Sequence, residues 1–321
     1  MVAKLTDVAK LAGVSPTTVS RVINNKGYLS EKTKAKVHAA MRELGYKPNN
    51  LARGLQGKSS KLIGLIFPKI SNIFYAEIIE HLENILFHQG YKVIICNSQN
   101  ESDKERDYLE MLAANQVDGI ISSSHNLDIE DYERVEAPIV AFDRNLAPHI
   151  PVISSDNFEG GKLAAVSLEK VGCQKKTVMF TGNDNSNSTT GLRQQGFSSV
   201  LPHAKVFNIS SDYSAIRKEM EIKAILEQEQ PQGIFASDDM TAILTMKIAD
   251  DLGIKVPQDL KIVGYDGTQF VENYFPQLTT IKQPIKEIAE LLVDVLLAKI
   301  AGKEVQESYI LPISLLTGKS L

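Results

Sequence analysis

The chain has 321 residues, of which 43% are hydrophobic and 23% charged, with a formal net charge of −4 at pH 7. This is enough for two or three domains with hydrophobic cores, and no apolar stretch is long enough to span a membrane. Cys96 and Cys173 form no CxxC motif, so we expect them to be packed side chains. The first residues lack an apolar export segment, so we expect the chain to stay in the cytoplasm.

The N-terminal segment is predicted to form two short helices joined by a tight turn at Gly13. Eight apolar positions would pack these helices together: Leu5, Val8, Ala9, Leu11, Ala12, Val14, Val19 and Val22. We expect Thr6 to cap the first helix and Ser15 the second, with Pro16 at the first helical position, where its missing N–H does no harm. The second helix would show solvent only small polar residues and Arg21, which suits insertion into a DNA major groove.

Charge favours DNA binding over the alternative of a plain surface hairpin. Residues 1–60 contain eight Lys and three Arg against three acidic residues, a net charge of +8, so residues 61–321 carry −12. A basic head on an acidic body is expected of a DNA-binding module attached to a part that does not bind DNA.

A third helix is predicted over residues 31–44, with Ser30 as its cap and Gly45 at its end. Its inner face would consist of Val37, Ala40, Met41 and Leu44. Residues 46–60 have the Pro, Gly and Ser content of a linker, yet they contain one apolar helical turn at 50–56. A helix that short would be marginal in water on its own.

From residue 62 onward, apolar strands alternate with amphipathic helices. The predicted strands are 62–68, 91–96, 119–123, 139–142, 152–155, 177–181, 205–209, 233–236, 261–264 and 279–282. Near-continuous apolar strands separated by helices predict parallel sheets covered on both faces. The second series restarts after a helix at 157–171, so we predict an α/β body of two parallel-sheet lobes. A last helix at 284–301 and a closing strand at 308–315 would return to the first lobe.

Polar residues gather in the loops that follow these strands, at 71–75, 122–124, 143–145, 183–193, 237–239 and 266–267. In such folds ligands bind at the carboxyl ends of the strands. Carboxylates, amides, an arginine and two aromatic rings around one cleft describe a carbohydrate site, because planar polar groups bind sugar hydroxyls and a ring stacks on the apolar face. For any single loop, a solvated turn or a helix cap is the alternative.

Motifs for catalysis are absent from the sequence, which contains no GxSxG, P-loop, HExxH or strand-following GxGxxG. Asp238 and Asp239 form a carboxylate pair of the kind that glycosidases use. Adjacent residues at a helix start point in different directions, however, so one of them is more simply an N-cap. We therefore expect no enzyme activity, no cofactor and no metal site.

Several short motifs occur together in this chain. They are Thr6-Asp7-Val8-Ala9, Gly13-Val14-Ser15, Thr18-Val19-Ser20-Arg21-Val22, Gly45-Tyr46, Pro48-Asn49, Ala52-Arg53, Leu55 and Gly264-Tyr265-Asp266. With them the chain resembles, over its whole length, the LacI/GalR family of bacterial transcriptional repressors, and most of all the branch that controls sucrose operons in Gram-positive bacteria.

The resemblance implies an all-α helix-turn-helix head followed by a periplasmic-binding-protein-like body. The helix-turn-helix domain would cover residues 1–46 and a hinge 47–60, with the two-lobed effector-binding and dimerisation domain over 61–321. Lobe one would comprise about 61–156 plus 284–321, and lobe two about 157–283.

The resemblance also implies which residues contact DNA. Pro16, Thr17 and Arg21 would face base edges, with Arg21 as a bidentate donor to guanine. The remaining contacts would come from Thr6 and from residues near phosphates: Ser15, Thr18, Asn24, Tyr46 and Asn49. Similar repressors form the hinge helix only on the operator and wedge a leucine into the minor groove, and here Leu55 holds that position with Ala52 beside it.

Effector positions of the family fall on Asn72, Phe74, Ser123, Asp143, Arg193, Asp239 and Asp266. Phe74 would stack on a sugar ring, while Arg193 and Asp266 would clamp hydroxyls. The implied protein is a homodimeric, nucleoid-associated repressor, released from a palindromic operator by sucrose, sucrose 6-phosphate or fructose. Two alternatives stay open: control by a phosphorylated protein corepressor, as in catabolite control, and a sugar-binding transport component.

Overall fold

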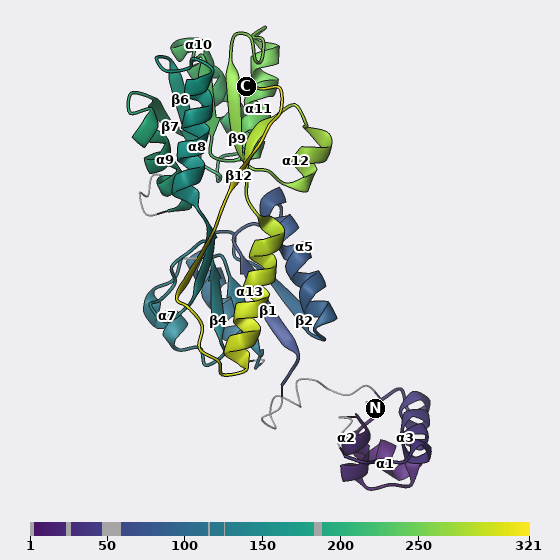
Figure 1. Ribbon diagram of the computed structural model, residues 1–321. Helices are drawn as coiled ribbons and strands as arrows, with labels where there is room; N and C mark the ends of the chain where they lie inside the picture. The colour runs from purple at the N-terminus through teal and green to yellow at the C-terminus, as the bar shows by residue number, and fades with distance from the viewer. Residues whose placement is uncertain (1–2, 24–26, 47–58, 115, 125, 183–187) are drawn as a thin grey trace. The chain divides into compact units, whose positions relative to one another are not determined.

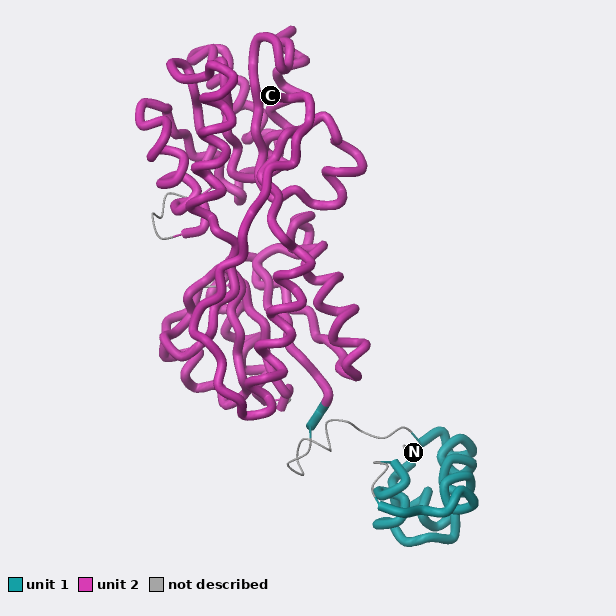
Figure 2. Tube along the Cα trace, viewed as in Figure 1, with its two compact units in different colours: residues 1–60 teal, residues 61–321 magenta. Residues whose placement is uncertain are grey.

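The computed structural model describes residues 3–23, 27–46, 59–114, 116–124, 126–182 and 188–321. The chain divides into two compact units, residues 1–60 and residues 61–321 (Figure 2). Most of the hinge predicted over 47–60, including its short helix at 50–56, lies outside the described residues.

Helices make up the described part of the N-terminal unit (Figure 1): α1 (Leu5–Ala12), α2 (Pro16–Ile23) and α3 (Glu31–Glu43). The turn after α1 contains Gly13 at φ 66°, a left-handed conformation that glycine adopts without steric cost. Helix α2 begins at Pro16, and the Ser15 Oγ accepts a hydrogen bond from the Thr18 N–H at 3.1 Å. These features confirm the predicted turn and the predicted start of the second helix.

The predicted cap of the first helix was wrong. Helix α1 already includes Thr6, and its N-cap is Lys4. The Lys4 backbone N–H donates to Asp7 Oδ2 at 2.8 Å, so a carboxylate in the first turn satisfies the helix start in place of a threonine hydroxyl.

A small core joins the three helices, and it consists of Val8, Ala9, Ala12, Val19, Val22, Val37 and Ala40. Two residues predicted to pack there lie at the surface instead, Leu11 at 46% exposure and Leu44 at 36%. Leu11 is one residue from the buried Ala12 and therefore points about 100° away around the helix. Leu44 follows the last residue of α3 as its C-cap, beyond the regular inner face.

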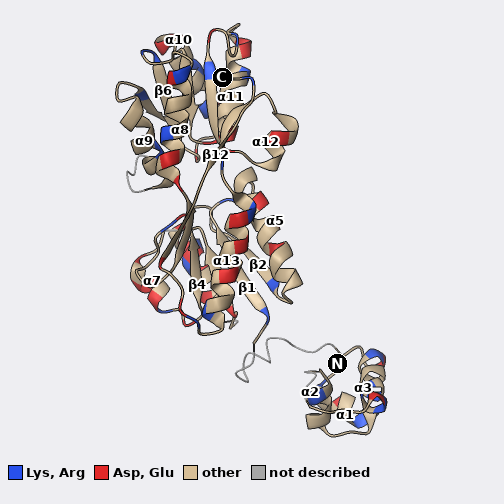
Figure 3. Ribbon diagram, in the orientation of Figure 1, with Lys and Arg blue, Asp and Glu red and all other residues tan. Residues whose placement is uncertain are grey.

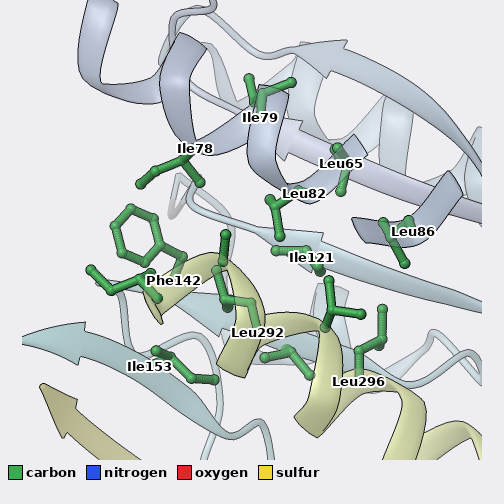
Figure 4. Close-up of a cluster of buried hydrophobic side chains, with 14 of the residues drawn as sticks. Leu65, Ile78, Ile79, Leu82, Leu86, Ile121, Phe142, Ile153, Leu292 and Leu296 are labelled. Carbon is green, nitrogen blue, oxygen red and sulfur yellow. The ribbon is translucent and has the colours of Figure 1, made fainter. Parts of the chain in front are cut away.

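Lobe one of the second unit is built on a parallel sheet in the order β11-β5-β4-β3-β1-β2. Its strands are β1 (Leu62–Phe67), β2 (Lys92–Asn97), β3 (Gly119–Ser122), β4 (Ile139–Phe142), β5 (Val152–Ser155) and β11 (Ser308–Leu311). Its helices are α5 (Ile73–His88), α6 (Ser102–Ala114), α7 (Ile129–Glu133) and α13 (Ile285–Ile300). Buried side chains of α5 and α13 pack with sheet residues such as Phe142 (Figure 4), while Leu109, Leu112 and Tyr132 belong to a separate core cluster.

Lobe two has a sheet in the order β12-β10-β9-β8-β6-β7. Its strands are β6 (Thr177–Thr181), β7 (Lys205–Asn208), β8 (Gly233–Ala236), β9 (Lys261–Asp266), β10 (Thr279–Lys282) and β12 (Ser314–Leu316). Its helices are α8 (Asn157–Lys170), α9 (Thr189–Val200), α10 (Ala215–Glu229), α11 (Asp239–Asp251) and α12 (Gln269–Tyr274). The predicted body of two parallel-sheet α/β lobes is thereby confirmed. None of the described helices is both long and apolar enough to cross a membrane.

The closing strand behaves differently from the prediction. Only β11 joins lobe one, beside β5, whereas β12 pairs antiparallel to β10 in lobe two. Ser320 also belongs to lobe two, since its Oγ accepts from the Thr279 N–H at 2.8 Å and donates to the Ile262 carbonyl at 2.6 Å. Pro312 lies between the two strands and cannot donate a ladder hydrogen bond, which divides the predicted strand.

Helices α8 and α9 approach each other so closely that only glycine fits at their crossing. A Cβ on Gly161 would lie 1.8 Å from the Arg193 carbonyl oxygen, and one on Gly196 would lie 1.9 Å from the Phe158 carbonyl oxygen. This close approach holds the backbone of Arg193 against the first turn of α8, beside Asn157.

Candidate functional site

A polar cleft of ≈ 660 Å³ lies between the two lobes of residues 61–321, at the carboxyl ends of the strands. Lobe one contributes Pro68, Lys69, Ser71, Asn72, Phe74, Tyr75, Asn100, Asn126, Asp143 and Arg144. Lobe two contributes Gly182, Thr189, Thr190, Arg193, Asn208, Ser210, Ser211, Asp212, Lys218, Ser237, Asp238, Met240 and Asp266. A second cavity in lobe two, between α11 and Phe275, is mostly apolar and lacks this convergence of polar groups.

Arg193 is the most strongly held charged residue of the cleft, at 5% exposure. Its Nε donates to Asn157 Oδ1 at 2.8 Å, and its Nη1 donates to the Ser237 carbonyl at 2.7 Å. The guanidinium lies 3.6 Å above the centre of the Tyr265 ring, and its Nη1 is 4.0 Å from Asp266 Oδ1. Arg193 is therefore fixed in place before any ligand binds, which reduces the entropy cost of binding.

Two carboxylates accompany Arg193, one from each lobe. Burial raises the pKa of both Asp143 and Asp266, and the positive charge of Arg193 opposes this in each case. Both residues have positive φ, 59° and 118°, a backbone strain that is typical of functional sites. Carboxylate acceptors beside guanidinium donors can bind neighbouring hydroxyls of a sugar ring.

The first turn of α5 supplies the aromatic part of the cleft. Asn72 caps this helix, and its Oδ1 accepts from the backbone N–H groups of Phe74 at 2.9 Å and Tyr75 at 3.3 Å. The Phe74 ring is 7% exposed and packs near Phe142, with 6.0 Å between ring centres. Tyr75 is more exposed, so it offers more ring surface to a sugar than Phe74 does.

Five of the seven predicted effector residues line the cleft, and Ser123 and Asp239 do not. Ser123 is fully buried, at 0% exposure. Asp239 is 2% exposed and accepts from Thr280 Oγ1 at 2.5 Å and from the Gly267 N–H at 2.8 Å. It therefore supports the loop after β9 from behind the cleft wall. Its neighbour Asp238 lines the cleft and caps α11.

Sequence reasoning missed the part of the cleft that follows β2, β3 and β7. These residues are Asn100, Asn126, Asn208, Ser210, Asp212 and Lys218. For one part of this set a signal was available, because Asn208 lies near the end of the strand predicted over 205–209 and Ser210 directly follows that strand, like the loops that were identified. Asn208 has a buried Oδ1 without a partner in the described structure, and Asn100 Nδ2 reaches Asp212 Oδ1 across the cleft at 3.4 Å.

Asp239 gives the body a testable pH dependence. Burial raises the pKa of its carboxyl to about 7, although the hydrogen bond from Thr280 opposes this. An unfolded Asp has a pKa of about 3.9, so at intermediate pH the folded chain binds the extra proton. The free energy of unfolding should fall as pH rises from about 4 to 7, by up to about 1.4 kcal/mol per pH unit. Asp239→Asn should flatten this decline in urea unfolding.

The matched control is Asp251→Asn, which removes an exposed carboxylate from the other end of the same helix. It is expected to leave the pH dependence of unfolding as in the parent chain. An equally steep decline in the parent and in Asp239→Asn would contradict the proton assignment.

Most of the predicted DNA contacts in the described part of the first unit lie at its surface. Thr6, Ser15, Pro16, Thr17 and Arg21 are exposed. Thr18 and Tyr46 are half-buried: Thr18 Oγ1 is 2.9 Å from Ser15 Oγ, and Tyr46 packs against the small core. Asn24, Asn49, Ala52 and Leu55 lie outside the described residues.

Charge supports a separate role for the first unit. Its helices carry Lys10, Arg21 and several basic residues of α3 (Figure 3). Helices α5, α7 and α13 of the second unit carry many acidic residues instead. No group of three or more His, Cys, Asp or Glu side chains that could hold a metal occurs in the part of the chain that the structure describes.

Comparison with known proteins gives consistent results. Residues 4–49 match the bacterial regulatory proteins of the lacI family, and residues 167–321 match a periplasmic binding protein-like domain. The chain is 72% identical to the sucrose operon repressor of Streptococcus mutans over 100% of both chains. It is 54% identical to that of Lactococcus lactis, over 97% of this chain and 98% of the relative. The lac repressor dimer bound to operator and the anti-inducer ONPF superimposes with a TM-score of 0.85 at 29% identity, covering 100% of this chain and 99% of that one.

Proposed function

Because the chain belongs to the LacI family of bacterial regulatory proteins, we propose that it represses a sucrose operon and leaves its operator when a sugar enters the cleft. The observation that carries the proposal is the cleft itself, in which a rigidly held arginine and two carboxylates from different lobes converge. The near-identical length and high identity of the sucrose operon repressors support the choice of sugar. As a repressor, the protein would work at the nucleoid and would catalyse no reaction.

The exposed face of α2 supports the DNA-binding step. Pro16, Thr17 and Arg21 are all exposed on one short helix, whose opposite side is anchored by the buried Val19 and Val22. In a helix-turn-helix protein such a face enters the major groove, and Arg can donate two hydrogen bonds to a guanine. A palindromic operator would match a two-fold symmetric dimer of this chain.

The charges that line the cleft favour a neutral ligand over a phosphorylated one. Its basic residues are Lys69, Arg144, Arg193 and Lys218, and its acidic residues are Asp143, Asp212, Asp238 and Asp266. An equal number of each leaves no excess cation for a phosphate, whereas hydroxyls can use both donors and acceptors. The volume of ≈ 660 Å³ also lies in the usual range for small-molecule sites, about 300–1,000 Å³.

Release would follow from a change in the angle between the lobes. Sugar binding draws together groups of both lobes, and in this proposal the new angle separates the two hinge segments of a dimer, so that their Leu55 wedges no longer pair. A difference in sugar affinity between the two states of about 1–3 kcal/mol is enough for such control.

The test is fluorescence anisotropy of a labelled palindromic duplex with a central CG step. The full chain is titrated in at fixed salt, and sucrose, sucrose 6-phosphate, fructose and glucose are then added separately. We expect tight binding that sucrose reverses. Binding that no sugar reverses would contradict the proposal and favour a phosphorylated protein corepressor, and the absence of DNA binding would favour a transport component.

A further inference from the structure

Two buried side-chain amides lie where the chain passes between the lobes of residues 61–321. Asn157 begins α8, directly after the first crossing from β5, and Gln283 follows β10 at the second crossing, before α13. They are 3% and 0% exposed, so their hydrogen bonds are not shared with bulk water. Neither residue belongs to the set that sequence reasoning identified, and neither lines the cleft.

Asn157 connects residues of both lobes through one side chain. Its Oδ1 accepts from Arg193 Nε at 2.8 Å and from the Tyr265 hydroxyl at 3.3 Å. Its Nδ2 donates to the Ser155 carbonyl at 3.0 Å and to Asp143 Oδ1 at 3.5 Å. These four bonds use all the hydrogen-bonding capacity of an amide side chain.

Gln283 makes the corresponding connection for Asp266. Its Nε2 donates to Asp266 Oδ1 at 2.9 Å, and its backbone N–H donates to the Asp266 carbonyl at 3.0 Å. Its Oε1 accepts from the hydroxyl of Ser155, the last residue of β5, which joins the first crossing to the second. The chain crosses between the lobes a third time, from β11 to β12. This crossing is attached to the first one, because the Asp156 N–H donates to the Leu311 carbonyl at 2.9 Å.

We propose that Asn157 and Gln283 are positioning residues that transmit the presence of a ligand in the cleft to the angle between the lobes. This inference rests on the proposed function. A ligand that bonds to Arg193 or Asp266 and also to residues of lobe one pulls on these side chains, and each of them is held directly by one of the two amides. Because a buried amide cannot move away from a partner without leaving a costly unpaired group, the crossing segments move with the ligand-binding residues.

The experiment measures operator affinity with and without saturating sucrose in the full chain. In the parent the ratio of the two dissociation constants is expected to lie between about 5 and 150. In Asn157→Leu and Gln283→Leu, which remove the amide bonds, we expect the ratio to fall towards one. Calorimetry of sucrose binding to the same variants should still detect binding, since Arg193 and Asp266 remain.

Ser155→Ala is the mildest variant, because it removes only the hydroxyl that bonds to Gln283 Oε1. It keeps the test decisive if either leucine variant does not fold. The double variant Ser155→Ala with Gln283→Leu should have the same ratio of dissociation constants as Gln283→Leu alone, because both changes remove the same bond.

The control is Ser167→Ala, which removes a hydroxyl bonded to the Leu163 carbonyl at 2.7 Å on the same helix as Asn157. It is expected to lower thermal stability slightly and to leave the ratio unchanged. If sucrose releases the parent from the operator and also releases the folded Asn157→Leu, Gln283→Leu and Ser155→Ala variants with the same ratio of dissociation constants, the inference is overturned and the proposed function stands. If neither sucrose nor any of the other three sugars releases the parent from the operator, both are overturned.

Discussion

Replacement of Arg193 by alanine is expected to abolish the response to sugar while leaving operator binding intact. The side chain holds two hydrogen bonds, to Asn157 and to the Ser237 carbonyl, and supplies the buried positive charge next to Asp266. A charged hydrogen bond contributes about 1.5–3 kcal/mol, so the loss of one such bond from the guanidinium to a sugar hydroxyl should lower the affinity for sucrose by roughly 10- to 150-fold. Calorimetry with sucrose and anisotropy with the operator measure the two effects separately.

The control for this change is Arg217→Ala. Arg217 is an exposed arginine on α10 that stacks on Tyr213 and does not line the cleft. The Arg217→Ala substitution removes the same charge and should leave the affinities for sugar and for operator near parental values. Because loss of a buried charge partner can destabilise the fold by about 3–5 kcal/mol, thermal unfolding must establish that Arg193→Ala is folded. A normal sucrose response in that variant would remove Arg193 from the site.

The second large effect is expected for Arg21→Ala on the exposed face of α2. If Arg21 donates to a guanine, its loss should cost about 1–3 kcal/mol of operator affinity and relax the preference at one base pair. Affinity for a scrambled duplex, which depends on phosphate contacts, should change much less. Anisotropy titrations with operator and scrambled duplexes, at one salt concentration, measure this difference.

Arg42→Ala is the matched control, since Arg42 is an exposed arginine in the last turn of α3 in the same unit. It lowers the charge of the head equally and should weaken binding to both duplexes by a similar, smaller factor. Equal losses in Arg21→Ala and Arg42→Ala on the operator would contradict a base contact by Arg21. Sucrose binding to the body should be the same in both variants.

Local elements of the fold were predicted well from sequence. The strands at 139–142, 152–155, 177–181, 233–236 and 279–282 have the predicted bounds, and the other strands of the two predicted series differ by at most two residues at an end. The closing strand predicted at 308–315 is instead divided into β11 and β12. The period of apolar residues and the capping chemistry of Ser15, Ser30 and Gly13 act over a few residues, which is why they can be read without tertiary contacts. Thr6, Leu11 and Leu44 were misplaced because helix ends depend on competing caps and small cores leave some apolar residues outside.

The candidate site was predicted less completely. Polar loops at strand ends indicated Asn72, Asp143, Arg193 and Asp266, which line the cleft, but also Ser123 and Asp239, which are buried behind its wall. A loop position indicates that a side chain is near the cleft. Whether the side chain faces the ligand or the protein depends on the backbone rotation there and on available partners, such as Thr280 for Asp239.

The amino-acid sequence by itself determined the separation of a basic helical head from an acidic body, the alternation of strands and helices, and the parallel-sheet architecture. These properties depend on residue charge and on periodicity within single elements. Only the tertiary structure decided how the closing strand divides between the sheets and how Asn157 and Gln283 connect the lobes. The bond between Asn157 and Arg193 joins residues 36 positions apart, and that between Ser155 and Gln283 joins residues 128 apart. Such contacts form only when packed helices and sheets bring distant segments together, so no local pattern in the chain encodes them.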